Sequence, residues 1–259
     1  MWNPEQYNKF NDHRTRPATD LINAIPNLQY ESIVDLGCGS GHITQMLYTK
    51  FLPKYLTGID NSEAMLTKAR TDFPQLNWQL EDISHLSNLP KSQDLIFSTS
   101  ALQWINNHEQ LFNHLIQRTN KVMAIQMPSN FRFPAHALLR DTIQENKYFK
   151  IKLQNIVDKK PVIREEPVFT PDKYYAILNH QVTTVDIWET TYLQQLTGEN
   201  PVLEWVKGTA LLPVEEHLSP DEFIEFKAIY NEKLLRAYPQ ESNGITLFPF
   251  SRIFIVATK

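Results

Sequence analysis

Cysteine and glycine are scarce in this chain of 259 residues, and positive charge is not in excess. The one cysteine, Cys38, excludes an intrachain disulfide, and it has no basic neighbour that would activate it as a nucleophile. The net charge of −4 gives no general attraction to nucleic acid or to an anionic membrane, so neither is an expected partner. No apolar run approaches the length of a membrane span, and the polar opening Met1-Trp2-Asn3-Pro4 does not read as a signal peptide. We expect a cytoplasmic protein and a monomer.

The few glycines are concentrated. Three of the seven stand at alternate positions of one short stretch: Gly37, Gly39 and Gly41. The apolar run that ends at Asp35 predicts a buried strand, the glycines predict a tight turn, and the residues from His42 to Tyr48 predict a helix. Such a turn lets a ligand approach the bare backbone. Because His42 replaces the small residue that a dinucleotide fingerprint requires, we expect a different nucleotide-like ligand.

A second acidic residue, Asp60, follows the glycines at the spacing that is typical of nucleotide-binding units. The run from Tyr55 to Asp60 predicts a parallel strand, and Asp60 lies about 20 residues past the glycines, where nucleotide-binding units place a carboxylate for ribose hydroxyls. One carboxylate can accept from both hydroxyls. The segment from Ser62 to Arg70 predicts a helix with Met65 on its inward side.

The fourth predicted strand, Asp94 to Ser98, is apolar enough to be buried on both faces. Open α/β sheets place their reacting groups at the carboxyl ends of the strands. Gln103 and Trp104 follow this strand closely, and we therefore regard them as candidate acceptor-binding residues.

The pattern along the chain predicts an α/β protein with helices on both faces of its sheet. Five strand–helix units precede two late strands, at 183–192 and 251–257, which predicts a Rossmann-like, seven-stranded, mostly parallel sheet with a reversed edge strand. We expect a single domain over 1–259. Its parts are a helical lid at 1–26, a cofactor-binding core at 31–128, a helical cap insertion at 129–182, and late strands and helices at 183–259.

Motifs spread over the whole chain carry a resemblance to one known family. They are Trp2-Asn3-Pro4, Arg14-Thr15-Arg16-Pro17, Asp35-Leu36-Gly37-Cys38-Gly39, Thr57-Gly58-Ile59-Asp60, Leu102-Gln103-Trp104, Val185-Asp186-Ile187-Trp188 and Arg252-Ile253-Phe254-Ile255-Val256-Ala257. In these motifs the chain resembles the trans-aconitate 2-methyltransferases. The resemblance implies a class I methyltransferase fold, S-adenosylmethionine as cofactor, and transfer of its methyl group to a carboxylate of trans-aconitate, which gives a monomethyl ester.

The resemblance also implies cofactor contacts. A carboxylate at Asp35 suits a cofactor that carries an ammonium and a sulfonium, and Asp82 matches the position that accepts a hydrogen bond from the adenine amino group. The expected cofactor-binding residues are Asp35, Gly37, Gly39, Gly41, Asp60, Met65, Asp82, Ile83 and Ser98.

The implied acceptor is a small carboxylic acid. Its carboxylate, with a pKa of about 4, is ionised at neutral pH and needs no general base, so we expect no catalytic acid–base residue and no metal. A tricarboxylate does require cations, preferably arginines. The expected acceptor-binding residues are Tyr7, Arg14, Arg16, Gln103, Trp104, Arg140 and Arg252.

Two positions depart from the family pattern. Leu212 and Glu189 stand where family members tend to have arginine, so fewer carboxylates would be recognised. Two alternatives stay open at this point: a methyltransferase of another acceptor, which would be a malonyl thioester, a fatty acid or a small amine, or a non-catalytic cofactor-binding protein of the same fold.

Overall fold

The computed structural model describes residues 11–85, 92–159, 163 and 167–259, and these form two compact units. The core unit comprises Trp2–Met127, Val168–Glu189 and Ile253–Lys259, and the helical unit comprises Pro128–Pro167 and Thr190–Arg252. Tyr7 lies outside the described residues, as does the side chain of Arg14.

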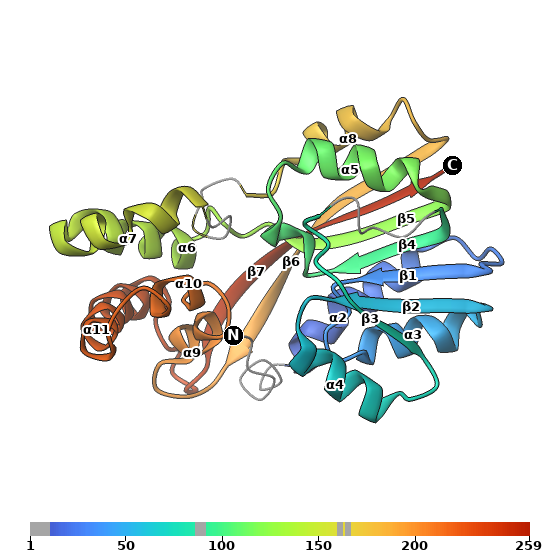
Figure 1. Cartoon of the computed structure of the whole chain (residues 1–259). Coiled ribbons are helices and arrows are strands. Elements are labelled where there is room, and N and C mark those ends of the chain that lie inside the picture. The colour runs from blue at the N-terminus through green and yellow to red at the C-terminus, as the bar shows by residue number, and fades with distance from the viewer. Residues whose placement is uncertain (1–10, 86–91, 160–162, 164–166) are drawn as a thin grey trace. The chain divides into compact units, whose positions relative to one another are not determined.

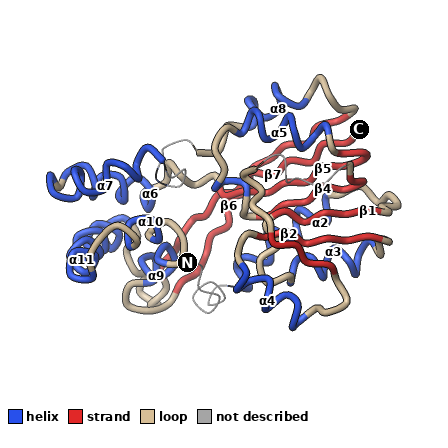
Figure 2. Tube along the Cα trace, viewed as in Figure 1, coloured by secondary structure: helices blue, strands red, loops and turns tan. Residues whose placement is uncertain are grey.

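The described residues contain seven strands. They are β1 (Ser32–Leu36), β2 (Tyr55–Asp60), β3 (Asn77–Leu80), β4 (Gln93–Thr99), β5 (Thr119–Pro128), β6 (Thr184–Leu196) and β7 (Thr246–Thr258). They form one seven-stranded sheet in the order β3-β2-β1-β4-β5-β7-β6 (Figure 2). Neighbouring strands from β3 to β5 are parallel, and β7 is antiparallel. The predicted fold is confirmed, and the reversed strand lies between β5 and β6.

The helices of the core unit follow from the strand order. They are α2 (Asn11–Ala24), α3 (His42–Phe51), α4 (Glu63–Asp72), α5 (His108–Gln117), α8 (Pro171–Leu178) and the short 3₁₀ helix η2 (Leu102–Trp104). Strands β2 and β3 lie on one side of β1, whereas β5 lies on the other side of β4. Right-handed crossovers therefore place α3 and α4 on one face of the sheet and α5 on the opposite face, where Figure 1 shows α8 beside it. Strands covered on both faces require continuous apolar runs, which β4 and β5 supply.

Helix α2 begins earlier than its sequence predicts. The sequence predicts a helix over roughly Pro17 to Ala24, which agrees with the preference of proline for the first turn of a helix. Instead it is continuous from Asn11 with Pro17 inside it. The loss of one backbone hydrogen bond is offset by an apolar face, since Ala18, Leu21 and Ile22 are almost fully buried.

The helical unit contains only part of the predicted 129–182 cap: α8, which also lies in that range, belongs to the core unit. The helices of the helical unit are α6 (Pro134–Glu145), α7 (Lys147–Lys159), α9 (Pro201–Lys207), α10 (Leu212–Glu215) and α11 (Pro220–Ala237). Two buried hydrogen bonds join the start of α6 to α11 and to the residue after it: Tyr230 donates to the Ala135 carbonyl, and the Ala135 amide donates to Tyr238 Oη. A capping box formed by Ser219 and Glu222 begins α11.

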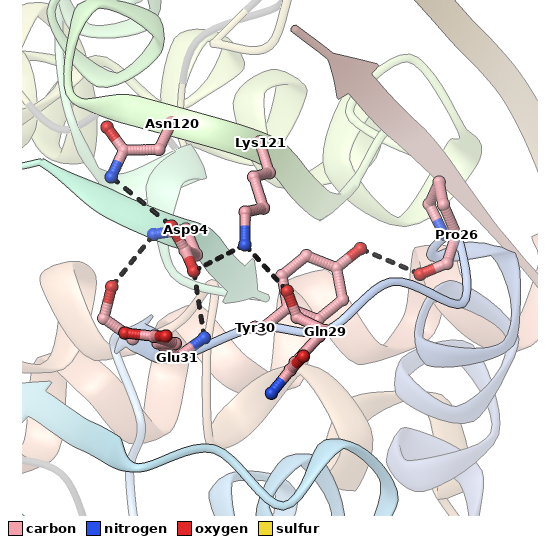
Figure 3. A network of polar contacts seen from close by, with 8 residues as sticks. Pro26, Gln29, Tyr30, Glu31, Asp94, Asn120 and Lys121 are labelled. Atoms are coloured by element: carbon pink, nitrogen blue, oxygen red, sulfur yellow. Dashed lines mark hydrogen bonds and ion pairs between the residues drawn. The ribbon is translucent and has the colours of Figure 1, made fainter.

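A polar network closes the amino-terminal edge of the core sheet (Figure 3). Oδ2 of the buried Asp94 accepts hydrogen bonds of 2.9 Å from the Glu31 amide and from Lys121 Nζ. Lys121 also donates to the Gln29 carbonyl, and Asn120 Nδ2 donates to Asp94 Oδ1. Burial alone would raise the pKa of Asp94, but these donors outweigh it and hold the pKa below its ordinary value. The network joins β4, β5 and the chain that leads into β1.

Candidate active site

The strand order places a topological switch point at the carboxyl ends of β1 and β4. These two strands are neighbours, and the chain leaves them toward helices on opposite faces of the sheet. Such a switch point is where open α/β sheets bind ligands. The turn after β1 carries the glycines, and the turn after β4 carries Gln103 and Trp104, so the predicted cofactor and acceptor turns lie on adjacent strands.

The glycine turn is fixed to the end of β2. The amides of Gly37 and Cys38 both donate to the Ile59 carbonyl, at 2.8 and 3.0 Å, and the Gly39 amide donates to Asp60 Oδ2 at 2.9 Å. Gly37 has a φ of +77°, and a Cβ there would lie 2.2 Å from the Ala101 Cβ. The glycine turn and the turn after β4 therefore meet closely at this glycine.

Gly39 differs from Gly37 in its surroundings. Its φ of +54° also favours glycine, but a Cβ added there would meet no described atom within 4 Å. No described residue thus obstructs the backbone at Gly39, and approach of a ligand to this turn stays a prediction.

Trp78 supports the glycine turn from the edge strand β3. A Cβ at Gly41 or at Gly58 would lie 2.4 Å from its indole ring, so both glycines are required for the ring to fit. The indole Nε1 donates to the Phe73 carbonyl at 3.2 Å. Glycine at both positions was visible in the sequence, but the tryptophan that requires them was not identified.

Asp35 is fully buried at the end of β1. Its Oδ2 accepts a hydrogen bond of 2.6 Å from Thr44 Oγ1, on the first turn of α3, and its Oδ1 has no partner among the described residues. Burial raises the pKa of Asp35 to about 7, the Thr44 hydroxyl opposes this rise, and the charge of Asp60 adds to it. A buried acceptor without a donor is costly, so this carboxylate is suited to a ligand that carries hydrogen-bond donors and positive charge.

Asp60, at the end of β2, is hydrogen-bonded to the glycine turn and to the residue that precedes α4. Its Oδ2 accepts from the Gly39 amide and its Oδ1 from the Ser62 amide, each at 2.9 Å. Burial raises the pKa of Asp60, and these amide donors partly offset the rise. Each carboxylate oxygen keeps further lone-pair capacity for a ligand hydroxyl.

The remaining cofactor candidates differ in exposure. Met65 is buried on the first turn of α4, and Asp82 and Ile83 are half-buried just beyond β3. Asp82 Oδ1 accepts from the Ser84 amide at 2.8 Å. The Ser98 side chain is fully buried and donates to the Leu36 carbonyl at 2.7 Å, so its hydroxyl joins β4 to β1.

The turn after β4 contains a strained residue. Ser100 has a φ of +55°, which is uncommon for a residue with a side chain. Gln126 on β5 holds it: the Ser100 amide donates to the Gln126 carbonyl at 2.9 Å, and the two side chains meet at 3.4 Å. Gln103 Nε2 donates to the Ser100 carbonyl at 2.8 Å, which leaves Gln103 Oε1 buried without a partner in the described part of the chain. Trp104 is half-buried.

The arginines predicted to bind the acceptor are distributed over both units. Arg16 is exposed on α2 in the core unit. In the helical unit, Arg140 donates to the Phe131 carbonyl at 2.9 Å, and Arg252 is buried with its guanidinium carbon 4.8 Å from the Phe250 ring centre. Leu212 begins α10 and is half-buried. Glu189 is exposed and lies in the part of β6 that belongs to the core unit.

Comparisons with known proteins identify the family of the chain. Residues 33–121 match the family model described as "Methyltransferase domain". The fold and this match therefore define a class I methyltransferase. The chain is 38% identical to the trans-aconitate 2-methyltransferase of Klebsiella pneumoniae and 36% identical to that of Rhizobium meliloti, each over 100% of this chain and 98% of the relative. The chain belongs to the trans-aconitate 2-methyltransferase family.

Solved structures support the fold. The YcgJ protein from Bacillus subtilis is similar with a TM-score of 0.60 at 12% identity, over 95% of this chain and 98% of that one. Phosphoethanolamine N-methyltransferase 2 of Haemonchus contortus, solved in complex with S-adenosyl-L-methionine, is similar with a TM-score of 0.53 at 13% identity, over 94% of this chain and 52% of that one. Among the described residues, no helix combines the length and apolar composition that crossing a bilayer requires.

Proposed function

We propose that this protein binds S-adenosylmethionine at the glycine turn and transfers its methyl group to a carboxylate of a small organic acid, most directly trans-aconitate. One observation carries the proposal. Asp35 presents a buried carboxylate oxygen without a partner beside the glycine turn, in a chain that belongs to the trans-aconitate 2-methyltransferase family.

The residues of the core unit fit such a cofactor. Asp35 would accept from its ammonium group, Gly39 would let it reach the backbone, and Asp60 would accept from the ribose hydroxyls. Met65, Asp82 and Ile83 would hold the adenine. When bound, the cofactor supplies a methyl group activated by its positively charged sulfur.

The acceptor chemistry needs positioning and no proton transfer. A carboxylate oxygen attacks the methyl carbon, the new oxygen–carbon bond forms as the carbon–sulfur bond breaks, and the electron pair of that bond goes to sulfur. The protein's part is to align oxygen, carbon and sulfur and to remove water from the carboxylate. Gln103 and Trp104 lie on the turn next to the glycine turn and are proposed to orient the acceptor.

Recognition of the acceptor is assigned to arginines, whose planar donors suit carboxylates. Arg252 and Arg140 are the proposed ligands from the helical unit, and Arg14 and Arg16 those from α2, with Tyr7. Leu212 and Glu189 reduce the number of such cations relative to the family pattern. A malonyl thioester, a fatty acid or a small amine therefore remains the competing kind of acceptor.

A panel assay tests the proposal. Methyl transfer from labelled S-adenosylmethionine is measured with trans-aconitate, cis-aconitate, isocitrate, a malonyl thioester, a medium-chain fatty acid and a small amine. The proposal predicts the highest kcat/KM for trans-aconitate. Preference for another member would keep the methyltransferase assignment and reject the acceptor, whereas cofactor binding with no turnover of any member would support a non-catalytic role.

A further inference from the structure

A chain of buried hydrogen bonds runs from α8 to the turn after β4. His108 begins α5 and Tyr174 lies on α8, 66 positions later, and both are almost completely buried. His108 Nδ1 is hydrogen-bonded to Tyr174 Oη, and His108 Nε2 lies 3.0 Å from the Leu102 carbonyl oxygen. The Phe169 amide lies 3.2 Å from Tyr174 Oη. All four residues belong to the core unit.

The partners determine which atom donates in each bond. A carbonyl can only accept, so His108 Nε2 carries a proton and donates to Leu102. Burial lowers the pKa of His108 to about 4, so the ring is neutral and its Nδ1 accepts. Tyr174 Oη therefore donates to Nδ1, while it accepts from the Phe169 amide. Each bond between these four residues thus has one donor and one acceptor, and the backbone of Ile105 also interacts with His108.

Apolar rings enclose these polar groups. The Tyr174 ring centre lies 4.6 Å from that of Phe112, and the His108 ring centre lies 5.7 Å from that of Phe169. No described hydrogen bond of the chain serves a surface group, so removal of one member leaves a buried partner unsatisfied. An apolar pair of similar size could fill the same space, which means that packing alone does not account for the histidine and the tyrosine.

This series of hydrogen bonds ends at Leu102, the first residue of η2. Leu102 is followed directly by Gln103 and Trp104. The other end of the same turn is Ser100, whose backbone has a positive φ and whose amide donates to the Gln126 carbonyl. Because the turn is short, fixing the Leu102 carbonyl and Ser100 fixes the direction in which the Gln103 side chain leaves the backbone.

We propose that His108 and Tyr174 are positioning residues for the acceptor, which act by holding η2 through the Leu102 carbonyl. The inference rests on the proposed function, since it gives η2 the acceptor-binding role. It assigns to α8, the first helix after the 128–167 segment, a part in orienting the acceptor. Neither residue touches the reacting atoms.

Three variants separate the links of the chain. His108→Leu removes the bonds to Leu102 and to Tyr174, and His108→Gln keeps a side-chain amide that can donate to the Leu102 carbonyl. Tyr174→Phe removes the bonds to His108 and to the Phe169 amide but leaves the bond to Leu102. For each, we would measure the KM for trans-aconitate, the Kd for S-adenosylmethionine and the Tm. We expect His108→Leu to raise the acceptor KM at least tenfold with less than a twofold change in cofactor Kd. His108→Gln should recover most of the wild-type KM, and Tyr174→Phe should lie between the two.

A matched control distinguishes positioning from stability. Leu115→Ala removes a buried side chain from the same helix and leaves the hydrogen bonds of His108 and Tyr174 in place. Its acceptor KM is compared with that of His108→Leu under conditions in which the two variants have lost the same amount of stability, as judged from Tm. An equal rise in acceptor KM in Leu115→Ala, or no rise in His108→Leu, would overturn the inference. Nitrogen-15 NMR should also find His108 neutral with its proton on Nε2 from pH 5.5 to 8.5. If the wild-type protein methylates none of the panel acids, the proposed function itself fails; turnover without the KM difference rejects this inference alone.

Discussion

Thr44 donates a hydrogen bond of 2.6 Å to Oδ2 of Asp35 and leaves Oδ1 without a partner among the described residues. The carboxylate is thereby oriented by the helix that follows the glycine turn, while one oxygen stays available. Neighbouring charges and hydrogen-bond donors decide whether a fully buried carboxyl of this kind is protonated or ionised. It links the ionisation of the free protein to the binding of a cationic ligand.

Cofactor binding should therefore depend on pH. Because burial raises the pKa of Asp35 to about 7, the ionised form that attracts an ammonium becomes scarce at lower pH. We expect the Kd for S-adenosylmethionine to rise by up to about tenfold per unit as pH falls from 7 to 5, and to be nearly constant above pH 8. Titration calorimetry from pH 5 to 8.5 measures this.

Two variants serve as controls for that dependence. Asp35→Asn should bind weakly at every pH, because the ionisable group is gone. Thr44→Val should move the inflection to higher pH, since the Thr44 hydroxyl lowers the pKa of Asp35. A wild-type Kd that does not change across this range would refute the role of Asp35.

The same shift has a consequence for stability with a defined sign. The pKa of Asp35 is higher in the folded protein than its ordinary value of 3.8, so folding favours the protonated form. This contribution to the free energy of unfolding is complete below pH 4 and is lost as pH rises through about 7. We expect the stability of wild type relative to Asp35→Asn to fall between pH 4 and pH 7, as measured by urea unfolding. A constant difference over that range would contradict the pKa assignment.

Gly39→Ala should separate binding from folding. The positive φ is unfavourable for alanine and costs about 1 kcal/mol, but no described atom obstructs the added methyl group. We expect a loss of cofactor affinity of more than tenfold with only this small loss of stability. Gly244→Ala is the matched control, because its φ is +79° and its surroundings are also open. Equal cofactor affinity in the two variants would show that the ligand does not approach Gly39.

Lys121→Met tests the network at the amino edge of the sheet. The ion pair with Asp94 has a partly exposed lysine, so we expect a loss of about 1 kcal/mol in the free energy of unfolding at pH 7. The pKa of Asp94 is lowered in the folded protein, so its stabilising contribution is present above pH 4 and is lost as pH falls through the folded value. The difference from wild type should shrink accordingly in acid. Lys68→Met, which breaks a surface pair with Asp72, should cost almost nothing, and an equal cost in both variants would argue against the network.

Arg252→Met tests acceptor recognition within the helical unit. Methionine keeps much of the length of the buried side chain beside Phe250 but removes the charge. We expect a rise in the acceptor KM of at least tenfold with little change in the cofactor Kd. Arg236→Met is the control, since that arginine is exposed and pairs with Glu232. An unchanged KM in Arg252→Met would make Arg252 a structural residue.

Much of the fold could be predicted because its signals are local. The apolar run that ends at Asp35, the alternate glycines and the acidic end of β2 each depend on a few neighbouring residues, and the structure has β1, the turn and β2 where these signals lie. The start of α2 was predicted wrongly, because the tertiary burial of Ala18 and Leu21 outweighs the local preference of Pro17.

The contacts that complete the site could not be predicted because they join distant positions. Trp78 fits against Gly41 and Gly58, and His108 meets Tyr174 across 66 positions. No periodicity or spacing within one sequence encodes such a contact. A histidine directly after the Asn107 cap and a tyrosine inside a helix are each ordinary residues until the fold brings them together.

The most direct measurement is the identity of the methylated product. The protein is incubated with trans-aconitate and S-adenosylmethionine that carries a deuterated methyl group, and the product is analysed by mass spectrometry and NMR before and after mild alkali. We predict one deuterated methyl group per trans-aconitate, attached to a carboxylate oxygen and released as methanol by alkali. Formation of no methylated trans-aconitate would contradict the assignment of the acceptor, and a product whose methyl group resists alkali would contradict the assignment of this protein as a carboxylate methyltransferase.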